Sequence, residues 1–184
     1  MSHNIPPEPW HSFLTDVDAL VPGEVHLYCF GGFVMQQLYE LPRPTSDVDT
    51  LPISPNDQIG FLLENAGRGS ELHKKHKIHL DIVTVCTYPE NYKDRLTELF
   101  PGVYQNLRIH ALEVHDLALA KIERNSPRDR EDIKFLAKKV PLDLRTLKDR
   151  YEKELRPYLA NPPREDLTIK LWIEMIEEDK AKNS

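Results

Sequence analysis

The stretch that decides the fold runs from Gly31 to Leu51 and reads GGFVMQQLYELPRPTSDVDTL. It follows a short apolar run, residues 24–30, with the composition of a buried strand. Two glycines end that strand, and Phe33 to Tyr39 then has helical spacing. After a loop stiffened by two prolines, residues 47–53 alternate as a strand does. The stretch therefore predicts a strand, a glycine turn, a helix and a second strand.

The flanking sequence extends this pattern in both directions. The apolar spacing predicts further helices over residues 9–21, 58–65, 115–124, 142–159 and 163–180, a helix opening at Ser126–Pro127, and a strand over 78–87. The predicted class is α/β, a mixed sheet flanked by helices and followed by a C-terminal helical bundle. We expect an α/β core over residues 1–112 and a helical region packed on it over 113–184.

Acidic residues stand at corresponding points of two predicted strands. Asp47 and Asp49 flank Val48, so the period of two places both carboxylates on one face. In HLDIVTV (residues 79–85), Leu80 and Ile82 take the core face and leave Asp81 on the other. If the two strands are neighbours, three carboxylates converge.

Three ionised carboxylates this close need a counter-charge. At about 4 Å and an effective dielectric near 20 they repel by roughly 4 kcal/mol per pair. A hard cation that prefers oxygen ligands, Mg²⁺ or Mn²⁺, neutralises them and can align phosphates for in-line transfer. The alternatives are a turn acid for Asp47 and Asp49 and a solvent-facing edge acid for Asp81.

The pair Gly31-Gly32 lies between a strand and a helix start. Without Cβ atoms the backbone can approach a ligand closely, and the first N–H groups of the helix attract phosphate. A tight turn explains a glycine pair equally well. The order of glycines, helix, acid pair and third acid is the more specific signal.

In these motifs and their order, the chain resembles the nucleotidyltransferase-like superfamily over residues 24–140. The run RPTSDVD (residues 43–49) and the later DLALAKIERNSPRDREDIKFL are similar to its bacterial toxin-type branch, the AbiEii/MenT-like and related uncharacterised nucleotidyltransferases. Glycine stands at position 32 where many members have serine, so a hydroxyl contact to phosphate is missing. The residues after about 140 resemble nothing we can name.

The resemblance implies a role for each matching residue. Asp47, Asp49 and Asp81 would be catalytic metal ligands, with Asp81 also the general base for the acceptor hydroxyl. The residues implied in nucleotide binding are Gly31, Gly32, Arg43, Ser46, Lys121 and Asp129. The alternatives are structural: Lys121 as a solvated lysine, and Asp129 as an acid that suits the N-terminus of a helix capped by Ser126. Arg43 would hold an acid or a phosphate.

Charge limits the kind of partner. Thirty acids against twenty-four bases give a net charge of -6, which repels a nucleic acid backbone, so such contacts must rely on local patches. The densest basic patch is residues 73–79, either a solvated loop or a contact to RNA or nucleotide phosphate. No apolar run is long enough for a membrane span and no leader precedes the first helix, so we expect a cytoplasmic protein without a membrane partner.

The resemblance implies Mg²⁺-dependent transfer of a nucleotidyl group from an NTP to an acceptor hydroxyl. The toxin-type likeness favours RNA, such as a tRNA end, as acceptor, and with it an antitoxin partner; a protein side chain is the other acceptor. Two rival functions stay open: a non-catalytic module that binds a nucleotide or protein, and a metal-dependent nuclease.

Overall fold

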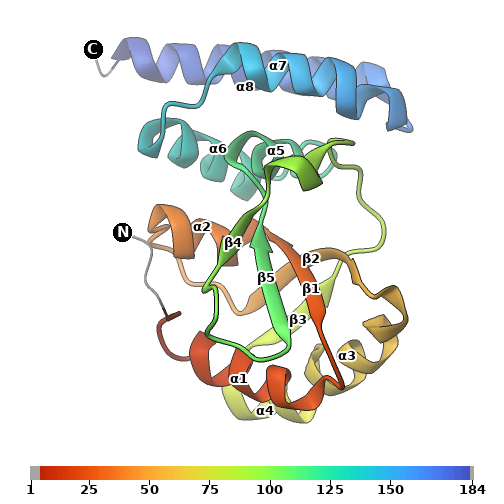
Figure 1. The fold of residues 1–184 in the computed structure, drawn as a ribbon. Coiled ribbons are helices and arrows are strands. Elements are labelled where there is room, and N and C mark those ends of the chain that lie inside the picture. Colours follow the sequence, from red (N-terminus) through yellow and green to blue (C-terminus); the bar gives the residue numbers. More distant parts are fainter. Residues whose placement is uncertain (1–4, 183–184) are drawn as a thin grey trace. The chain divides into compact units, whose positions relative to one another are not determined.

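Two units divide the chain in the computed structural model, which describes residues 5–182 (Figure 1). The first, here the sheet unit, holds residues 5–84 and 96–112. The second, the helical unit, holds residues 85–95 and 113–182. No helix within the described range is both long and apolar enough to cross a membrane.

A five-stranded mixed sheet forms the centre of the sheet unit, with the strand order β3-β2-β1-β5-β4. Strand β1 is parallel to β5 and β2 is parallel to β3, whereas β1/β2 and β4/β5 are antiparallel. The strands are β1 (Val25–Phe30), β2 (Asp47–Ser54), β3 (His79–Ile82), β4 (Thr97–Leu99) and β5 (Leu107–Ala111). The predicted α/β class with a mixed sheet is confirmed.

Apolar residues pack the helices of this unit together. Trp10 of the first helix and Phe33 of the second have ring centroids 5.0 Å apart. The helices are α1 (Trp10–Leu20), α2 (Gly31–Tyr39), a 3-10 turn (Asn56–Gln58), α3 (Ile59–Ala66) and α4 (Glu71–His76). Helix α2 packs against β1 and β2, while α3 and α4 pack against β3. Both glycines of the expected turn are the first residues of α2.

The sheet has one core face and one partly exposed face. In β1, Val25, Leu27 and Cys29 are almost fully buried, whereas His26 between them is half-buried. Strand β5 alternates in the same way, with buried residues at its ends and centre. Because side chains alternate along a strand, the two sets project to opposite faces.

Helices alone make up the regular structure of the helical unit. They are a 3-10 turn (Tyr92–Arg95), α5 (Val114–Leu119), α6 (Pro127–Lys139), α7 (Leu144–Arg150), a π-helical turn (Tyr151–Leu155), a 3-10 turn (Arg156–Tyr158) and α8 (Pro162–Lys182). Their core gathers around Trp172 and Tyr151, which are 1% and 2% exposed. The C-terminal helices of the predicted fold class are confirmed.

Several boundaries differ from expectation. The strand predicted over 78–87 ends at Ile82, because β3 is an edge strand and pairs only with the first half of β2. The helix predicted over 115–124 is regular only to Leu119 and continues as turns. The helix predicted over 142–159 is α7 followed by the π and 3-10 turns. Pro157 explains this break, since it has no N–H for the carbonyl four residues earlier.

Residues 85–95, which we expected in the N-terminal core, lie in the helical unit. Arg95 donates to Asp116 and to Glu154 of that unit, both at 2.8 Å or less. The backbone N–H of Glu90 also donates to the carbonyl of Glu154. The segment therefore leaves the sheet at β3, contributes to the helical unit and returns at β4.

Candidate active site

The carboxylates of the two acid-bearing strands lie on one face of the sheet. In the parallel pairing of β2 with β3, Asp49 is the register partner of Asp81, and Asp47 is the partner of His79. Neighbouring strands are about 4.8 Å apart, so partner side chains on one face adjoin. Asp47 and Asp49 are half-buried and Asp81 is exposed, while Val48 between the acids is fully buried. The condition on which the three-carboxylate prediction depended, neighbouring strands, is met.

Gly31 faces the acid pair directly. A Cβ added to Gly31 would lie 2.2 Å from Oδ2 of Asp49, and Gly31 has a φ of +71°. Both observations require glycine, the first for space and the second for backbone conformation. Phe30, the preceding residue, is the register partner of Asp49. The N-terminus of α2 and the acid pair therefore form one site.

The loop before β2 contributes a residue that sequence reasoning did not assign. The hydroxyl of Thr45 donates to Oδ1 of Asp47. The hydroxyl oxygen of Thr45 also lies 3.0 Å from a Cβ built on Gly32. Thr45 therefore orients Asp47 and lies against the second glycine. Its signal in the sequence was its place two residues before Asp47 in a strand-like alternation.

Arg43 and Ser46 lie in the same loop. The carbonyl of Arg43 accepts a hydrogen bond of 2.6 Å from Nε2 of Gln36 in α2. The carbonyl of Ser46 accepts one of 3.0 Å from the backbone N–H of His79. These bonds fix the loop between α2 and β3, so the structure brings both residues to the border of the site.

His79 is a second residue beside the acids, which the sequence placed only in the basic patch over 73–79. It is 2% exposed and neither ring nitrogen has a hydrogen-bond partner among residues 5–182. Burial, with the nearby charges of Arg68 and His73, lowers the pKa of His79, and Asp47 and Asp81 oppose this shift. Burial therefore favours the neutral form of this imidazole beside the acids. The signal was its spacing of two from Asp81, which places both on one face.

The protein supplies only some of the oxygen ligands that a hard cation needs. Within the described part of the chain, no group of three or more His, Cys, Asp or Glu side chains is arranged to hold a metal ion. Asp47 and Asp49 still offer two carboxylates beside a helix N-terminus. Mg²⁺ is commonly bound by one or two carboxylates together with substrate phosphates. These two residues fit that mode of binding.

The basic patch predicted over 73–79 is largely compensated by acids. Most of it forms α4, where Lys74 pairs with Glu71 at 2.6 Å. Lys75 and His76 both contact Oδ2 of Asp16 at 2.6 Å. These pairs tie α4 to α1 and leave less free positive charge than the sequence suggested.

Lys121 and Asp129 lie in the helical unit, within one buried network. Nζ of Lys121 is 2.9 Å from Asp132 and 3.3 Å from Asp129, and all three residues are at most 3% exposed. Asp129 also forms a capping box with Ser126 at the start of α6. Although burial opposes it, hydrogen bonds from Arg124 and Ser126 lower the pKa of Asp129. The structural role considered for Asp129 is present, and a nucleotide-binding role for either residue stays a prediction.

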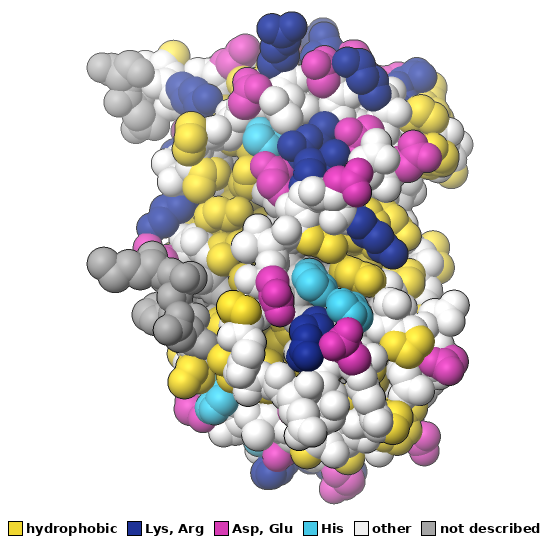
Figure 2. Space-filling model, in the orientation of Figure 1, with side chains coloured by type: hydrophobic (Ala, Val, Ile, Leu, Met, Phe, Trp, Pro, Cys, Tyr) yellow, Lys and Arg dark blue, Asp and Glu magenta, His cyan; other side chains and the backbone are white. Residues whose placement is uncertain are grey.

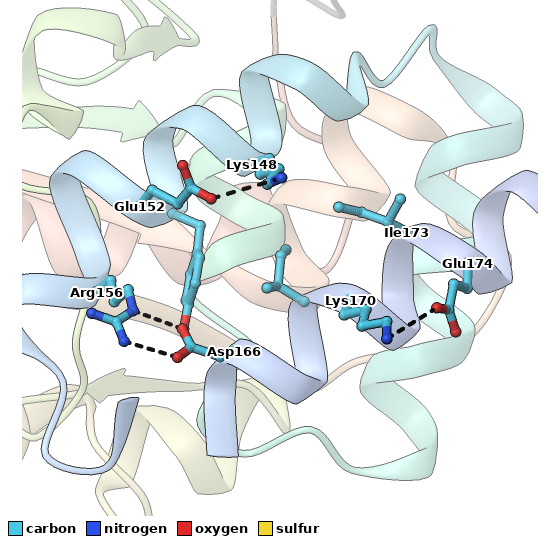
Figure 3. A pocket seen from close by; sticks show the side chains of 9 residues that line it. Lys148, Glu152, Arg156, Asp166, Lys170, Ile173 and Glu174 are labelled. Carbon is cyan, nitrogen blue, oxygen red and sulfur yellow. Dashed lines mark hydrogen bonds and ion pairs between the residues drawn. The ribbon is translucent and has the colours of Figure 1, made fainter. Parts of the chain in front are cut away.

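A groove of about 570 Å³ also lies in the helical unit, between the α7–π turn segment and α8 (Figure 3). Its floor includes Tyr151, Ile169 and Ile173. The charged residues on its rim are paired with each other: Arg156 with Asp166, Lys148 with Glu152, and Lys170 with Glu174. We therefore do not assign this groove to the nucleotide.

Comparison with known proteins gives one family. The model of the family described as "Nucleotidyltransferase of unknown function (DUF6036)" matches residues 16–180. No curated protein and no solved structure gives a significant match. The match covers both units and supports the superfamily resemblance rather than its AbiEii/MenT-like branch.

Proposed function

The chain belongs to the DUF6036 family of nucleotidyltransferases of unknown function, and from this premise we propose that it transfers a nucleotidyl group from an NTP to an acceptor hydroxyl with Mg²⁺ or Mn²⁺. The observation that carries the proposal is the contact of the Asp49 carboxylate with Gly31. This contact supports the proposal because it brings an acid of β2 and the first residue of α2 side by side. Asp81 is the register partner of Asp49 on the neighbouring strand.

Each residue has a distinct task in this reaction. Asp47 and Asp49 would hold the cation, which supplies charge neutralisation for the triphosphate when bound. The first N–H groups of α2 would bind phosphate, and the two glycines there put no Cβ in the way. Asp81 accepts the proton of the acceptor hydroxyl. That oxygen forms the new bond to the α-phosphorus, and the bond from this phosphorus to the β-phosphate oxygen breaks to release pyrophosphate.

The primary test is transfer of label from α-³²P-NTP by the variants Asp47→Asn and Asp49→Asn. Because each removes one charge from the cation site, we expect transfer to fall by roughly 10²–10³-fold, the range for a lost electrostatic contact in a transition state. Asp57→Asn is the matched control, since Asp57 is an exposed acid of the same unit. Wild-type activity in both site variants would contradict the proposal.

An RNA acceptor, a tRNA end in particular, and a toxin role with an antitoxin partner are proposals that rest on the resemblance. Their test is induced expression in a bacterial host. We expect growth arrest and labelled RNA with the wild-type chain, and normal growth with Asp49→Asn. Arrest that persists in the Asp49 variant would separate toxicity from transfer and contradict this part.

A non-catalytic nucleotide-binding module is the second candidate, favoured by Gly32 in place of the serine common in the superfamily. Calorimetry with Mg²⁺ and each NTP, followed by a product assay, separates the two. Binding without transfer to RNA or protein would support the module. Shortening of RNA instead of lengthening would support the nuclease alternative.

A further inference from the structure

Three rings of the sheet unit form a nearly flat cluster, here called the ring platform: His26 and Tyr28 of β1 and His110 of β5. The planes of His26 and His110 differ by 3°, and their centroids are 5.2 Å apart. Nδ1 of His26 is 2.9 Å from Nε2 of His110. A hydrogen bond along the line of centroids places the two imidazoles side by side in one plane. Tyr28 is tilted from His110 by 25° at 5.7 Å.

The ring platform lies on the same face of the sheet as the acids. His26, Tyr28 and Phe30 alternate with the buried core residues of β1, and Phe30 is the register partner of Asp49. His110 is the register partner of Tyr28. At about 3.3 Å per residue, Tyr28 lies about 7 Å and His26 about 13 Å along β1 from the position opposite Asp49. An aromatic stripe thus leads from the candidate active site to the platform.

Part of this platform is open to solvent. The side chain of His26 is 35% exposed, and His110 is half-buried. Figure 2 shows adjacent histidine side chains at the surface over the sheet, with acidic and basic side chains around them. Tyr28, at 8% exposed, presents little of its own ring to solvent.

Hydrogen bonds join the two imidazoles to each other and to an acid. Nε2 of His26 is 3.0 Å from Glu24 and donates to it, and one hydrogen bond joins Nδ1 of His26 to Nε2 of His110. Burial, and next the neighbouring His26, lower the pKa of His110. Arg108, the register partner of His26, is paired with Glu24 at 3.1 Å. Glu24 therefore compensates positive charge beside the platform, which offers chiefly ring surface.

We propose that the ring platform is a stacking site for a nucleobase. The proposal rests on the proposed function, because it deepens the same site by naming what lies beyond the reacting phosphate. Bases stack on aromatic side chains whatever their sequence, since each base has a π-face. The source of the base is either the NTP itself or a nucleotide close to the reacting hydroxyl of a polynucleotide acceptor, and the two share the chemistry of the planar ring.

The test uses the full chain and follows the imidazole Cε1–H signals of His26 and His110 by NMR. The probes are each NTP with Mg²⁺, and a single-stranded tetranucleotide of RNA. A stacked base shields the rings, so we expect saturable upfield shifts. Shifts with the NTP alone assign the platform to the nucleotide, and shifts with the tetranucleotide alone assign it to the acceptor. Unmoved signals with both probes overturn the proposal.

Variants separate stacking from structural roles. His26→Ala with His110→Ala should weaken binding of the active probe by at least about fivefold, the lower end of the loss for one base–aromatic stack. His26→Phe with His110→Phe keeps flat rings and removes the hydrogen bond, so it should restore most of the affinity. Equal affinity of the alanine variant and the wild type would overturn the proposal.

Failure of the two proposals can be told apart. If label transfer occurs but is insensitive to the alanine variant and both ring signals stay unmoved, the stacking site is wrong and the transferase proposal stands. If no transfer is found but the rings shift with a probe, the stacking site stands as a binding site of a non-catalytic module. Transfer to a protein substrate with unmoved ring signals also overturns the stacking site.

Discussion

At the scale of single residues, Gly31 determines both the turn of the backbone and the space beside Asp49. Its φ of +71° turns the chain from β1 into α2, and its missing Cβ makes room for Asp49. Substitutions elsewhere can separate these two requirements. Gly102 has a φ of +75° and nothing within 4 Å of its Cβ position. Substituting Gly31 and Gly102 separately therefore distinguishes the effect of backbone strain from the effect of the contact with Asp49.

We predict that Gly31→Ala lowers nucleotidyl transfer by far more than Gly102→Ala. Both substitutions place a Cβ in the left-handed region and should reduce the free energy of unfolding by about 1–2 kcal/mol. Only Gly31→Ala also displaces the Asp49 carboxylate. Urea unfolding and α-³²P-NTP transfer measure the two effects. Equal transfer rates in both variants would show that the contact with Asp49 has no catalytic consequence.

The acids were predictable from sequence, whereas their partners were not. Asp47 and Asp49 can be predicted because their spacing of two around a valine is visible within one strand. The hydroxyl of Thr45 and the imidazole of His79 acquire meaning only from contacts across α2, β2 and β3. A local pattern shows which face a residue takes, but not what lies beside it.

At the scale of elements, the start of α6 is the best-defined helix terminus. The Ser126 hydroxyl accepts from the N–H of Asp129, whose carboxylate accepts from the N–H of Ser126. We predict that Ser126→Ala lowers the free energy of unfolding by about 1 kcal/mol, since it leaves an N–H of the first turn without its cap. Ser126→Thr, which keeps the hydroxyl, should cost less. Urea denaturation compares them, and equal losses would contradict the cap's contribution.

Lys121, in the turns after α5, is tied to α6 through charge. We predict that Lys121→Met destabilises the protein by about 3–5 kcal/mol, because the buried Asp132 loses this cation while Asp129 keeps only Arg124. Lys138→Met is the control, since the Lys138 side chain is 60% exposed in its pair with Asp179, and surface pairs contribute about 0–1 kcal/mol. A folded Lys121 variant of normal stability that has lost transfer would instead assign Lys121 to the nucleotide.

Elements were predicted best where apolar periodicity was long and worst where a single residue interrupts it. The stripe of α6 and the strand β2 follow their sequence patterns closely. Pro157 breaks the expected helix over 142–159, although the apolar spacing on either side continues. β4 has three residues and pairs only with β5, so its sequence is too short to show a period.

At the scale of the whole molecule, the division of the chain depends on contacts that are distant in sequence. Arg95 reaches Asp116 and Glu154, which are 21 and 59 positions away. No composition change marks residues 85–95 as part of the helical unit, so the sequence suggested a continuous core up to residue 112. The strand signal of Ile78 to Thr87 reinforced this expectation, because β-branched residues continue past the point where pairing ends.

The two units should also respond to acid over different pH ranges. In the sheet unit the pKa of His110 is lowered from its ordinary value of about 6.5, chiefly by burial. The unfolded chain therefore binds a proton that the folded chain does not, and stability falls as pH decreases below about 6.5. In the helical unit burial alone would raise the pKa of Glu113, but His115 and Arg150 outweigh burial and lower this pKa from its ordinary 4.5 to about 2. The contribution of Glu113 to stability is therefore lost only as pH falls from about 4.5 toward 2.

We predict that the urea midpoint of the wild type decreases in both ranges, and that each variant reduces one slope, since the lowered pKa of His79 also contributes to the upper range. His110→Phe should flatten the decrease between pH 7 and pH 5.5, because its ring takes up no proton in the unfolded state. Glu113→Gln should leave that slope unchanged and flatten the decrease below about pH 4.5, with a lower stability at neutral pH since a charged partner of Arg150 is lost. Midpoints measured at half-unit pH intervals check both. An unchanged upper slope in His110→Phe would show that other groups govern the sheet unit's response to acid.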